Sequence, residues 1–115
     1  MDKAQQLLKF VFGYDSFRPL QKAIIDHIIS GQDALVLMPT GGGKSICYQI
    51  PALILEGVAL VVSPLISLMK DQVDALQANG VAAEAFNSSN EEYVNRIIRT
   101  RCQNGEIKIL YISPE

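Results

Sequence analysis

The sequence is poor in the residues from which redox, disulfide and many metal centres are built. It has one histidine and two cysteines among 115 residues. Cys47 and Cys102 lie far apart, form no CxxC pair and follow no secretory leader, so a reduced cytoplasmic setting is expected instead of a disulfide framework. His27 is expected to have a surface role.

Long apolar runs and an excess of positive charge are also missing. Pro64 and Ser67 interrupt the longest apolar stretches, well short of the ~20 residues that a membrane span needs, so no membrane partner is expected. The formal net charge is −2, so no global basic field indicates a nucleic-acid partner. Such a partner is not excluded, because backbone N–H groups and helix N-termini also hold phosphates. Hydrophobic residues make up 49%, enough for a packed core in one domain.

Four short apolar runs alternate with segments of helical period. The runs predict strands at 34–38, 58–62, 81–86 and 107–112, and the first two, which lack polar alternation, are expected to be buried. Strands that alternate with helices predict an α/β fold, in which a parallel sheet carries helices on both faces. Ligands of such sheets bind at the carboxyl ends of the strands.

The helices are delimited by turn and cap residues. They are predicted over 3–12, from Pro19 to about residue 30, from about Gly43 to a kink or end at Pro51, after Ser63 to Gly80, and after Ser89 to Asn104. Ser63 followed by Pro64 reads as a cap and a first helical position, with Gly80 as the C-terminal stop. Ser89 with Glu92 matches a capping box.

A glycine-rich loop separates the first predicted strand from a helix. Gly41, Gly42 and Gly43 leave the backbone bare, so their N–H groups can surround an anion at the positive end of the helix dipole. Lys44 would reach the β and γ phosphates of a nucleotide, and Ser45 would bind Mg²⁺. The general pattern GxxxxGK[ST] has its first glycine where Met38 stands here, and a flexible linker with an incidental lysine is the alternative.

A second candidate segment, "FGYDSFRPLQ", spans Phe12–Gln21. A glutamine can pair with the N6/N7 edge of adenine, Tyr14 can stack on the base, and Arg18 can add a cation–π contact. The plain alternative makes Phe17 and Leu20 core residues, and Arg18 and Gln21 solvated helix residues.

Three motifs in this order resemble the RecQ family of DNA helicases, in superfamily 2, over nearly the whole chain. "FGYDSFRPLQ" resembles the family's motif 0, "MPTGGGKSICYQIPA" its motif I, including the Met-Pro-Thr start, and "VVSPLISLMKDQV" its motif Ia. The resemblance implies an incomplete RecA-like P-loop domain that binds ATP and Mg²⁺. It implies adenine recognition by Tyr14, Arg18 and Gln21, and a phosphate loop shaped by Thr40 and the three glycines, with Lys44 as the catalytic lysine and Ser45 as the metal ligand.

Motif Ia gives a route to DNA in spite of the acidic charge. Ser63, Ser67 and the open N–H groups of a helix that starts at Pro64 can hold strand phosphates, and Lys70 can assist. Ser63 as a mere helix cap is the alternative. "YISPE" at 111–115 resembles the next segment that contacts nucleic acid.

The resemblance implies a parent protein larger than this chain. Residues 1–115 correspond to the N-terminal part of the first motor domain, before the DExH box, so the chain is expected to bind ATP weakly and hydrolyse none. The parent is expected to be an ATP-driven 3′–5′ helicase of DNA repair and recombination, acting on single-stranded and partly duplex DNA. In bacteria it would be associated with the nucleoid, and missing C-terminal domains would bind single-stranded-DNA-binding protein. The alternatives are a small P-loop phosphotransferase and a non-catalytic nucleotide-binding module.

Overall fold

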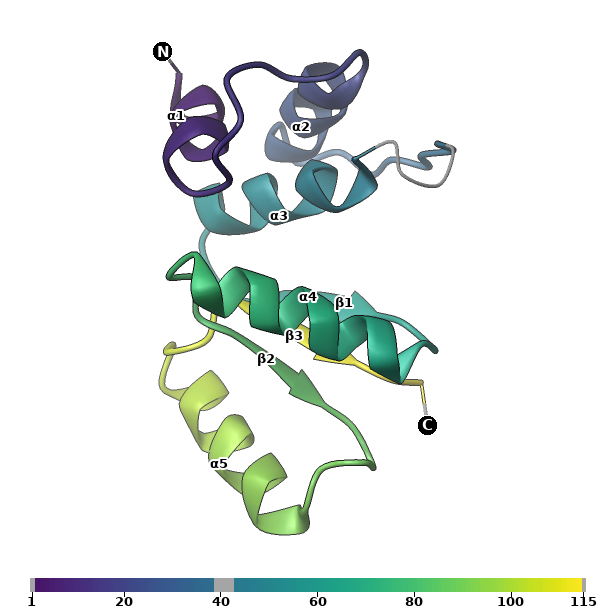
Figure 1. Ribbon diagram of the computed structural model, residues 1–115, viewed down its shortest axis with the longest axis vertical. Coiled ribbons are helices and arrows are strands. Elements are labelled where there is room, and N and C mark those ends of the chain that lie inside the picture. Colours follow the sequence, from purple (N-terminus) through teal and green to yellow (C-terminus); the bar gives the residue numbers. More distant parts are fainter. Residues whose placement is uncertain (1, 39–42, 115) are drawn as a thin grey trace. The chain divides into compact units, whose positions relative to one another are not determined.

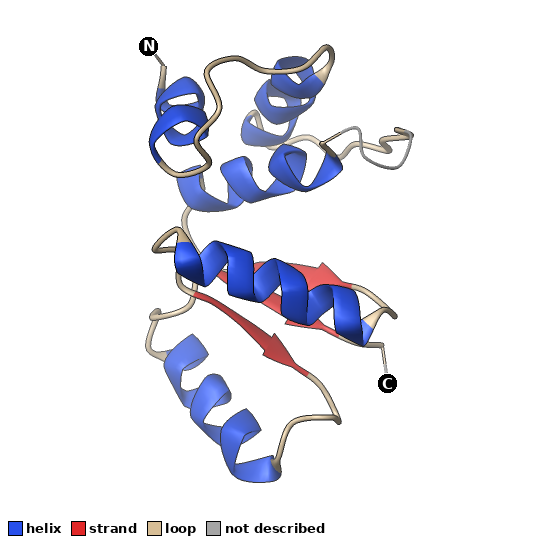
Figure 2. Ribbon diagram, viewed as in Figure 1, coloured by secondary structure: helices blue, strands red, loops and turns tan. Residues whose placement is uncertain are grey.

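The chain folds as two compact units. The computed structural model describes residues 2–38 and 43–114 (Figure 1). The first unit spans Met1–Glu56 and the second Gly57–Glu115. Helices make up the secondary structure described in the first unit, whereas the second unit combines helices with a sheet (Figure 2).

The first unit packs three helices around a small apolar core. They are α1 (Lys3–Phe10), α2 (Gln21–Ile29) and α3 (Lys44–Ile54). The buried side chains come from all three helices: Ala4, Leu8, Ile25, Ile46 and Ile50. α1 and α3 form over the predicted segments, with Asp2 capping α1 through a bond from the Gln5 backbone N–H. The predicted start of the second helix at Pro19 is wrong, because α2 begins two residues later.

Pro51 lies inside α3 and does not end it, contrary to one of the two predicted outcomes. The helix continues to Ile54, and the Leu55 N–H donates to the carbonyl of Pro51 at 2.9 Å. Proline removes its own helical donor and crowds the carbonyl one turn earlier, and burial of its ring and of the neighbouring Ile50 and Ala52 offsets this cost.

The predicted buried strand at 34–38 is wrong. These described residues form no strand, and the side chains of Leu35 and Leu37 are 90% and 87% exposed. A strand is stable only when a neighbouring strand pairs with its backbone, and the described residues of the first unit form no other strand to pair with this segment. The apolar run therefore indicates a preference for extended structure, but among the described residues no strand pairs with it.

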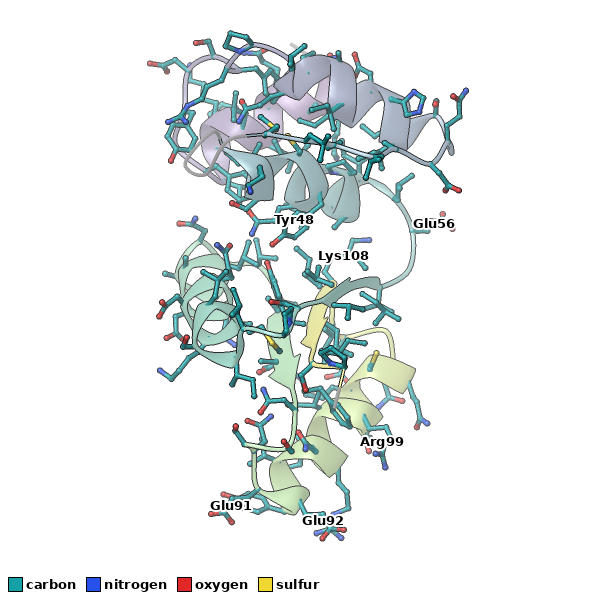
Figure 3. All side chains as sticks on the ribbon, turned by 90° about the vertical axis from the view of Figure 1, so that its right-hand side faces the viewer. Tyr48, Glu56, Glu91, Glu92, Arg99 and Lys108 are labelled. Carbon is teal, nitrogen blue, oxygen red and sulfur yellow. The ribbon has the colours of Figure 1, made fainter. Side chains whose placement is uncertain are left out.

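The second unit is a parallel sheet with a helix on each face. Its elements are β1 (Ala59–Val62), α4 (Ile66–Ala78), β2 (Ala83–Phe86), α5 (Glu92–Gln103) and β3 (Ile109–Ile112). The strand order is β1-β3-β2, with both pairs parallel, and Ile109 of β3 lies level with Ala59 and Ala83. Figure 3 shows α4 and α5 on opposite sides of the strands, which confirms the predicted class of fold.

The central strand is buried and the edge strand β1 is not. Residues 109–111 of β3 are all buried, whereas Leu60 and Val62 of β1 are exposed. The prediction that 58–62 is a buried strand is therefore correct in its location but wrong in its burial. An edge strand has one neighbour only, here β3.

Both predicted serine caps are wrong. α4 starts at Ile66 and α5 at Glu92, and neither helix has a side-chain cap. The Ser63 hydroxyl instead accepts a bond from the Leu65 N–H at 3.2 Å, within the loop before α4. Pro64 is thus not the first helical residue. The predicted stop at Gly80 is confirmed, since α4 ends at Ala78 and Gly80 has φ 81°.

In the described part of the chain, no helix has both the length and the apolar character required to cross a membrane.

Candidate functional site

In the first unit, one buried glutamine ties the upstream motif to the glycine loop. Gln21 is 2% exposed, and its side-chain Nε2 donates to the carbonyl of Gly43 at 3.0 Å. Its Oε1 accepts from the Arg18 backbone N–H at 2.8 Å. A side-chain amide has two N–H donors and two acceptor positions, so one of each remains for a ligand. The alternative that made Gln21 a solvated helix residue is therefore wrong.

Residues 18–21 form the tight turn that presents this glutamine. The Gln21 backbone N–H donates to the carbonyl of Arg18 at 3.2 Å, and Leu20 has φ 73° and ψ −19°. A proline at the second position and a positive φ at the third, closed by this bond, define a type II β-turn. The turn, and not a first helical position, is the physical reason for Pro19. Leu20 is 69% exposed, so its expected core role is also wrong.

A side chain at Gly43 would clash with the amide of Gln21. The φ of Gly43 is 81°, and a Cβ added there would lie 2.3 Å from the Gln21 Nε2. The bridge between the two motifs thus requires glycine at this position, because the backbone has a positive φ and because a Cβ would displace the Gln21 amide. This explains physically one of the three glycines that the sequence singled out.

A small cavity lies beside the bridge. It measures about 50 Å³, and its walls are Leu8, Tyr14, Ser16, Arg18, Gln21, Gly43 and Ile46. All three predicted adenine-recognising residues therefore line one hollow, with Tyr14 half exposed at 53%. The cavity is smaller than a purine, so base binding would require the exposed Tyr14 and Arg18 side chains to move outward.

The glycine loop leads into α3. Lys44 is the first residue of the helix and is exposed, and Ser45 is half-buried. The predicted Thr40, Gly41 and Gly42 lie outside the described residues. One turn further on, burial raises the pKa of the Cys47 thiol, so this cysteine is a neutral apolar side chain near neutral pH.

The predicted DNA-contacting residues lie in the second unit. Ser63 follows the carboxyl end of β1 and is half-buried, while Pro64, Ser67 and Lys70 are exposed. Ser67 and Lys70 belong to α4, and the Lys70 Nζ contacts Asp74 at 3.3 Å. That carboxylate offsets part of the charge that Lys70 offers to a phosphate. The open N–H groups belong to a helix start at Ile66 instead of Pro64.

A turn held by asparagine side chains follows β2, and sequence reasoning missed it. The Asn90 Nδ2 donates to the carbonyl of Ala85 at 2.7 Å and to the Asn95 Oδ1 at 2.9 Å. The Asn95 Nδ2 donates to the carbonyl of Asn87 at 2.9 Å. Because β1 and β2 are both parallel to β3, this turn and Ser63 share one edge of the sheet. The three asparagines that follow this strand, Asn87, Asn90 and Asn95, were the sequence signal that could have indicated the turn.

The described side chains fit Mg²⁺ only in part. Residues 2–38 and 43–114 contain no group of three His, Cys, Asp or Glu that could hold a metal ion. Mg²⁺ prefers oxygen ligands and commonly binds through one or two carboxylates together with substrate phosphates. The Ser45 hydroxyl supplies one suitable oxygen, and the remaining ligands would have to come from a bound nucleotide, water or other residues.

Comparison with known proteins gives consistent matches. A family model described as DEAD/DEAH box helicase matches residues 18–115. A Haemophilus influenzae protein named ATP-dependent DNA helicase RecQ is 55% identical over 97% of this chain. A Bacillus subtilis protein of the same name is 50% identical over 100% of the chain, and a rat protein named ATP-dependent DNA helicase Q1 is 42% identical over 98%. These matches confirm the resemblance drawn from the three motifs.

The chain is much shorter than the relatives that it matches. The chain spans 18% of the Haemophilus influenzae and rat proteins and 20% of the Bacillus subtilis protein. Among solved structures, a hypothetical ATP-dependent RNA helicase from Sulfolobus tokodaii superposes with a TM-score of 0.77. That comparison covers 99% of this chain and 34% of the other at 23% identity, so it shows the fold alone.

Proposed function

The chain belongs to the DEAD/DEAH box helicase family, and on that premise we propose that it forms the N-terminal part of the first motor domain of a RecQ-like, ATP-dependent DNA helicase. The observation that carries the proposal is the bond from Gln21 to Gly43, which joins the adenine-reading segment to the end of the phosphate loop. A phosphotransferase would have no need of this link.

In this proposal the first unit binds ATP through two groups of residues. Tyr14 stacks on adenine, and Arg18 adds a cation–π contact. Gln21 has one side-chain N–H and one Oε1 lone pair that the bridge does not use. The N–H donates to N7 of adenine, and the lone pair accepts from the N6 amino group. The ammonium group of Lys44 neutralises the β and γ phosphates, and the amides between Thr40 and Gly43 surround them. Mg²⁺, when bound, would screen phosphate charge beside the Ser45 hydroxyl.

The second unit would contact single-stranded DNA. Ser63 and Ser67 would donate to strand phosphates, assisted by the exposed N–H groups where α4 begins. Pro64 lies at a bend between β1 and α4, and Lys70 contributes charge shared with Asp74. Few lysines are needed for this mode of contact, in agreement with the net charge of −2.

The parent protein would couple these two functions. Hydrolysis would need acidic residues of a later strand and a second motor lobe, and cycles of closure and opening would move the protein 3′ to 5′ along the strand. We place the protein on DNA in the cytoplasm, at the nucleoid in a bacterium. Single-stranded-DNA-binding protein is a predicted partner of segments outside this chain.

Nucleotide binding is tested with Lys44→Ala and a fluorescent ATP analogue. We expect affinity to fall at least ~10-fold, because the lysine is the one side-chain cation that the motif directs at the phosphates. Lys3→Ala, at an exposed lysine of α1, is the matched control. Unchanged binding in Lys44→Ala would remove the loop as the site.

Base recognition and turnover give two further tests. Gln21→Ala should reduce the preference for adenine over guanine nucleotides, because the remaining amide groups are lost. The isolated chain should hydrolyse no ATP, with or without single-stranded DNA, whereas the full-length protein should show DNA-stimulated hydrolysis. DNA-stimulated turnover by residues 1–115 alone would contradict the proposed division of labour.

A further inference from the structure

Leu20 has a backbone conformation that leucine disfavours. In the described part of the chain it is the only residue other than glycine with a positive φ, at 73°. The third position of a type II turn strongly favours glycine or asparagine, because a Cβ there crowds the neighbouring backbone.

Packing among the described residues does little to explain why leucine occupies this position. The side chain is 69% exposed, so little burial offsets the backbone cost. With Pro19 at the second position, the same four residues can also form a type I turn, in which the third residue has a negative φ that leucine favours. The two turn types differ mainly in the orientation of the peptide between residues 19 and 20.

The turn type decides where Gln21 is held. In the observed type II form, Gln21 closes the turn through its backbone N–H, and its side chain reaches both Arg18 and Gly43. A rotated peptide changes the direction in which the chain enters α2, whose first residue is Gln21. The bridge to Gly43 therefore depends on the strained form of Leu20.

We propose that Leu20 is a positioning residue that tunes nucleotide affinity, since its strain keeps the bridged turn close in free energy to an unbridged one. The inference rests on the proposed function, because it assumes that nucleotide binds the bridged form. When the competent form is only partly populated, the apparent dissociation constant rises in inverse proportion to that population. Relieving the strain at residue 20 then tightens binding without adding any contact to the nucleotide.

The test is a pair of substitutions with opposite expected effects. Leu20→Gly makes a positive φ easy to adopt and should tighten binding of a fluorescent ATP analogue by up to about fivefold. Leu20→Ile adds a β-branch, which tolerates a positive φ least, and should weaken binding. Leu55→Gly and Leu55→Ile are matched controls, because Leu55 is also exposed but has an ordinary φ of −76°.

A spectroscopic signal separates positioning from general stability. The side-chain amide ¹⁵N–¹H resonances of Gln21 should shift toward the bridged state in Leu20→Gly and away from it in Leu20→Ile. Unchanged affinity and unchanged Gln21 resonances in Leu20→Gly would overturn the inference even if Leu20→Ile fails to fold. Lys44→Ala, measured alongside, reports on the proposed function itself, so each can fail without the other.

Discussion

The substitution Gly43→Ala tests the link between the two motifs directly. The added Cβ would lie 2.3 Å from the Gln21 Nε2, a distance that real contacts do not reach, so the amide must withdraw. The bond to the Gly43 carbonyl is then lost, and because Gln21 is 2% exposed, water does not easily replace it. The substitution should thus destabilise the chain before any nucleotide is involved.

The expected loss of stability combines a net backbone term with a term for the unpaired amide. A positive φ costs a residue with a Cβ about 1–2 kcal/mol, and the reduced entropy of the unfolded chain returns about 0.4–1 kcal/mol of this. A buried amide left without its partner costs up to about 1–3 kcal/mol more, and a turn that converts to the unbridged form recovers part of this cost. We expect a net loss of about 1–4 kcal/mol in the free energy of unfolding, more than the backbone term alone gives.

The assay is urea unfolding of the 115-residue chain, with Gly13→Ala as the matched control. Gly13 has nearly the same φ, 80°, but no atom lies within 4 Å of a Cβ built there, so only the backbone term applies. Combining Gly43→Ala with Gln21→Ala removes the clash, so the double variant should be less destabilised than the sum of the two singles. Equal losses at Gly43 and Gly13 would refute the reasoning.

Two further predictions concern stability elsewhere. The Asp2 carboxylate has a lowered pKa, first because it accepts a bond from the Gln5 backbone N–H and then because Lys22 lies beside it. Its contribution to the free energy of unfolding is therefore present above the ordinary pKa of 3.8 and is lost as pH falls through the pKa of the folded chain. The unfolding midpoint of Asp2→Asn should therefore fall less than that of the parent chain between about pH 6 and about pH 3, and an identical fall in both would contradict this. Asn95→Leu deletes two bonds of the turn after β2 and should cost about 1–3 kcal/mol in urea unfolding, while Arg96→Leu, exposed on the same helix, should cost less than about 0.5 kcal/mol. A similar loss in both would show that the asparagine bonds contribute nothing.

The fold could be predicted where the hydrophobic periodicity agrees with the turn and cap residues that end each element. Three of the four expected strands, at 58–62, 81–86 and 107–112, form within one residue or two of their predicted ends. Their apolar runs are each followed or preceded by a helical repeat with a clear stop, such as Gly80. The parallel order of the strands then follows from the crossovers that α4 and α5 make.

Two kinds of local signal misled the prediction. Ser63 and Ser89 match cap patterns, but the first hydroxyl accepts a bond within its own loop, and the Ser89 N–H donates to the Asn87 Oδ1 at 2.8 Å. Short polar side chains have several backbone partners within reach, so the spacing alone does not choose among them. The run at 34–38 has the composition of a buried strand, but pairing is a property of the whole sheet and not of the run.

The candidate site inverts the usual assignment of polar and apolar residues. At positions 20 and 21, the residue types predict a buried leucine and a solvated glutamine, and the structure has the reverse. The inversion has a physical cause, because a left-handed residue ahead of α2 rotates the glutamine inward, where Arg18 and Gly43 satisfy its amide. An exposed strained leucine beside a buried glutamine adds nothing to a hydrophobic core. Such local conflicts are common at functional sites, so the conflict at 18–21 supports the proposal that this turn takes part in binding a nucleotide.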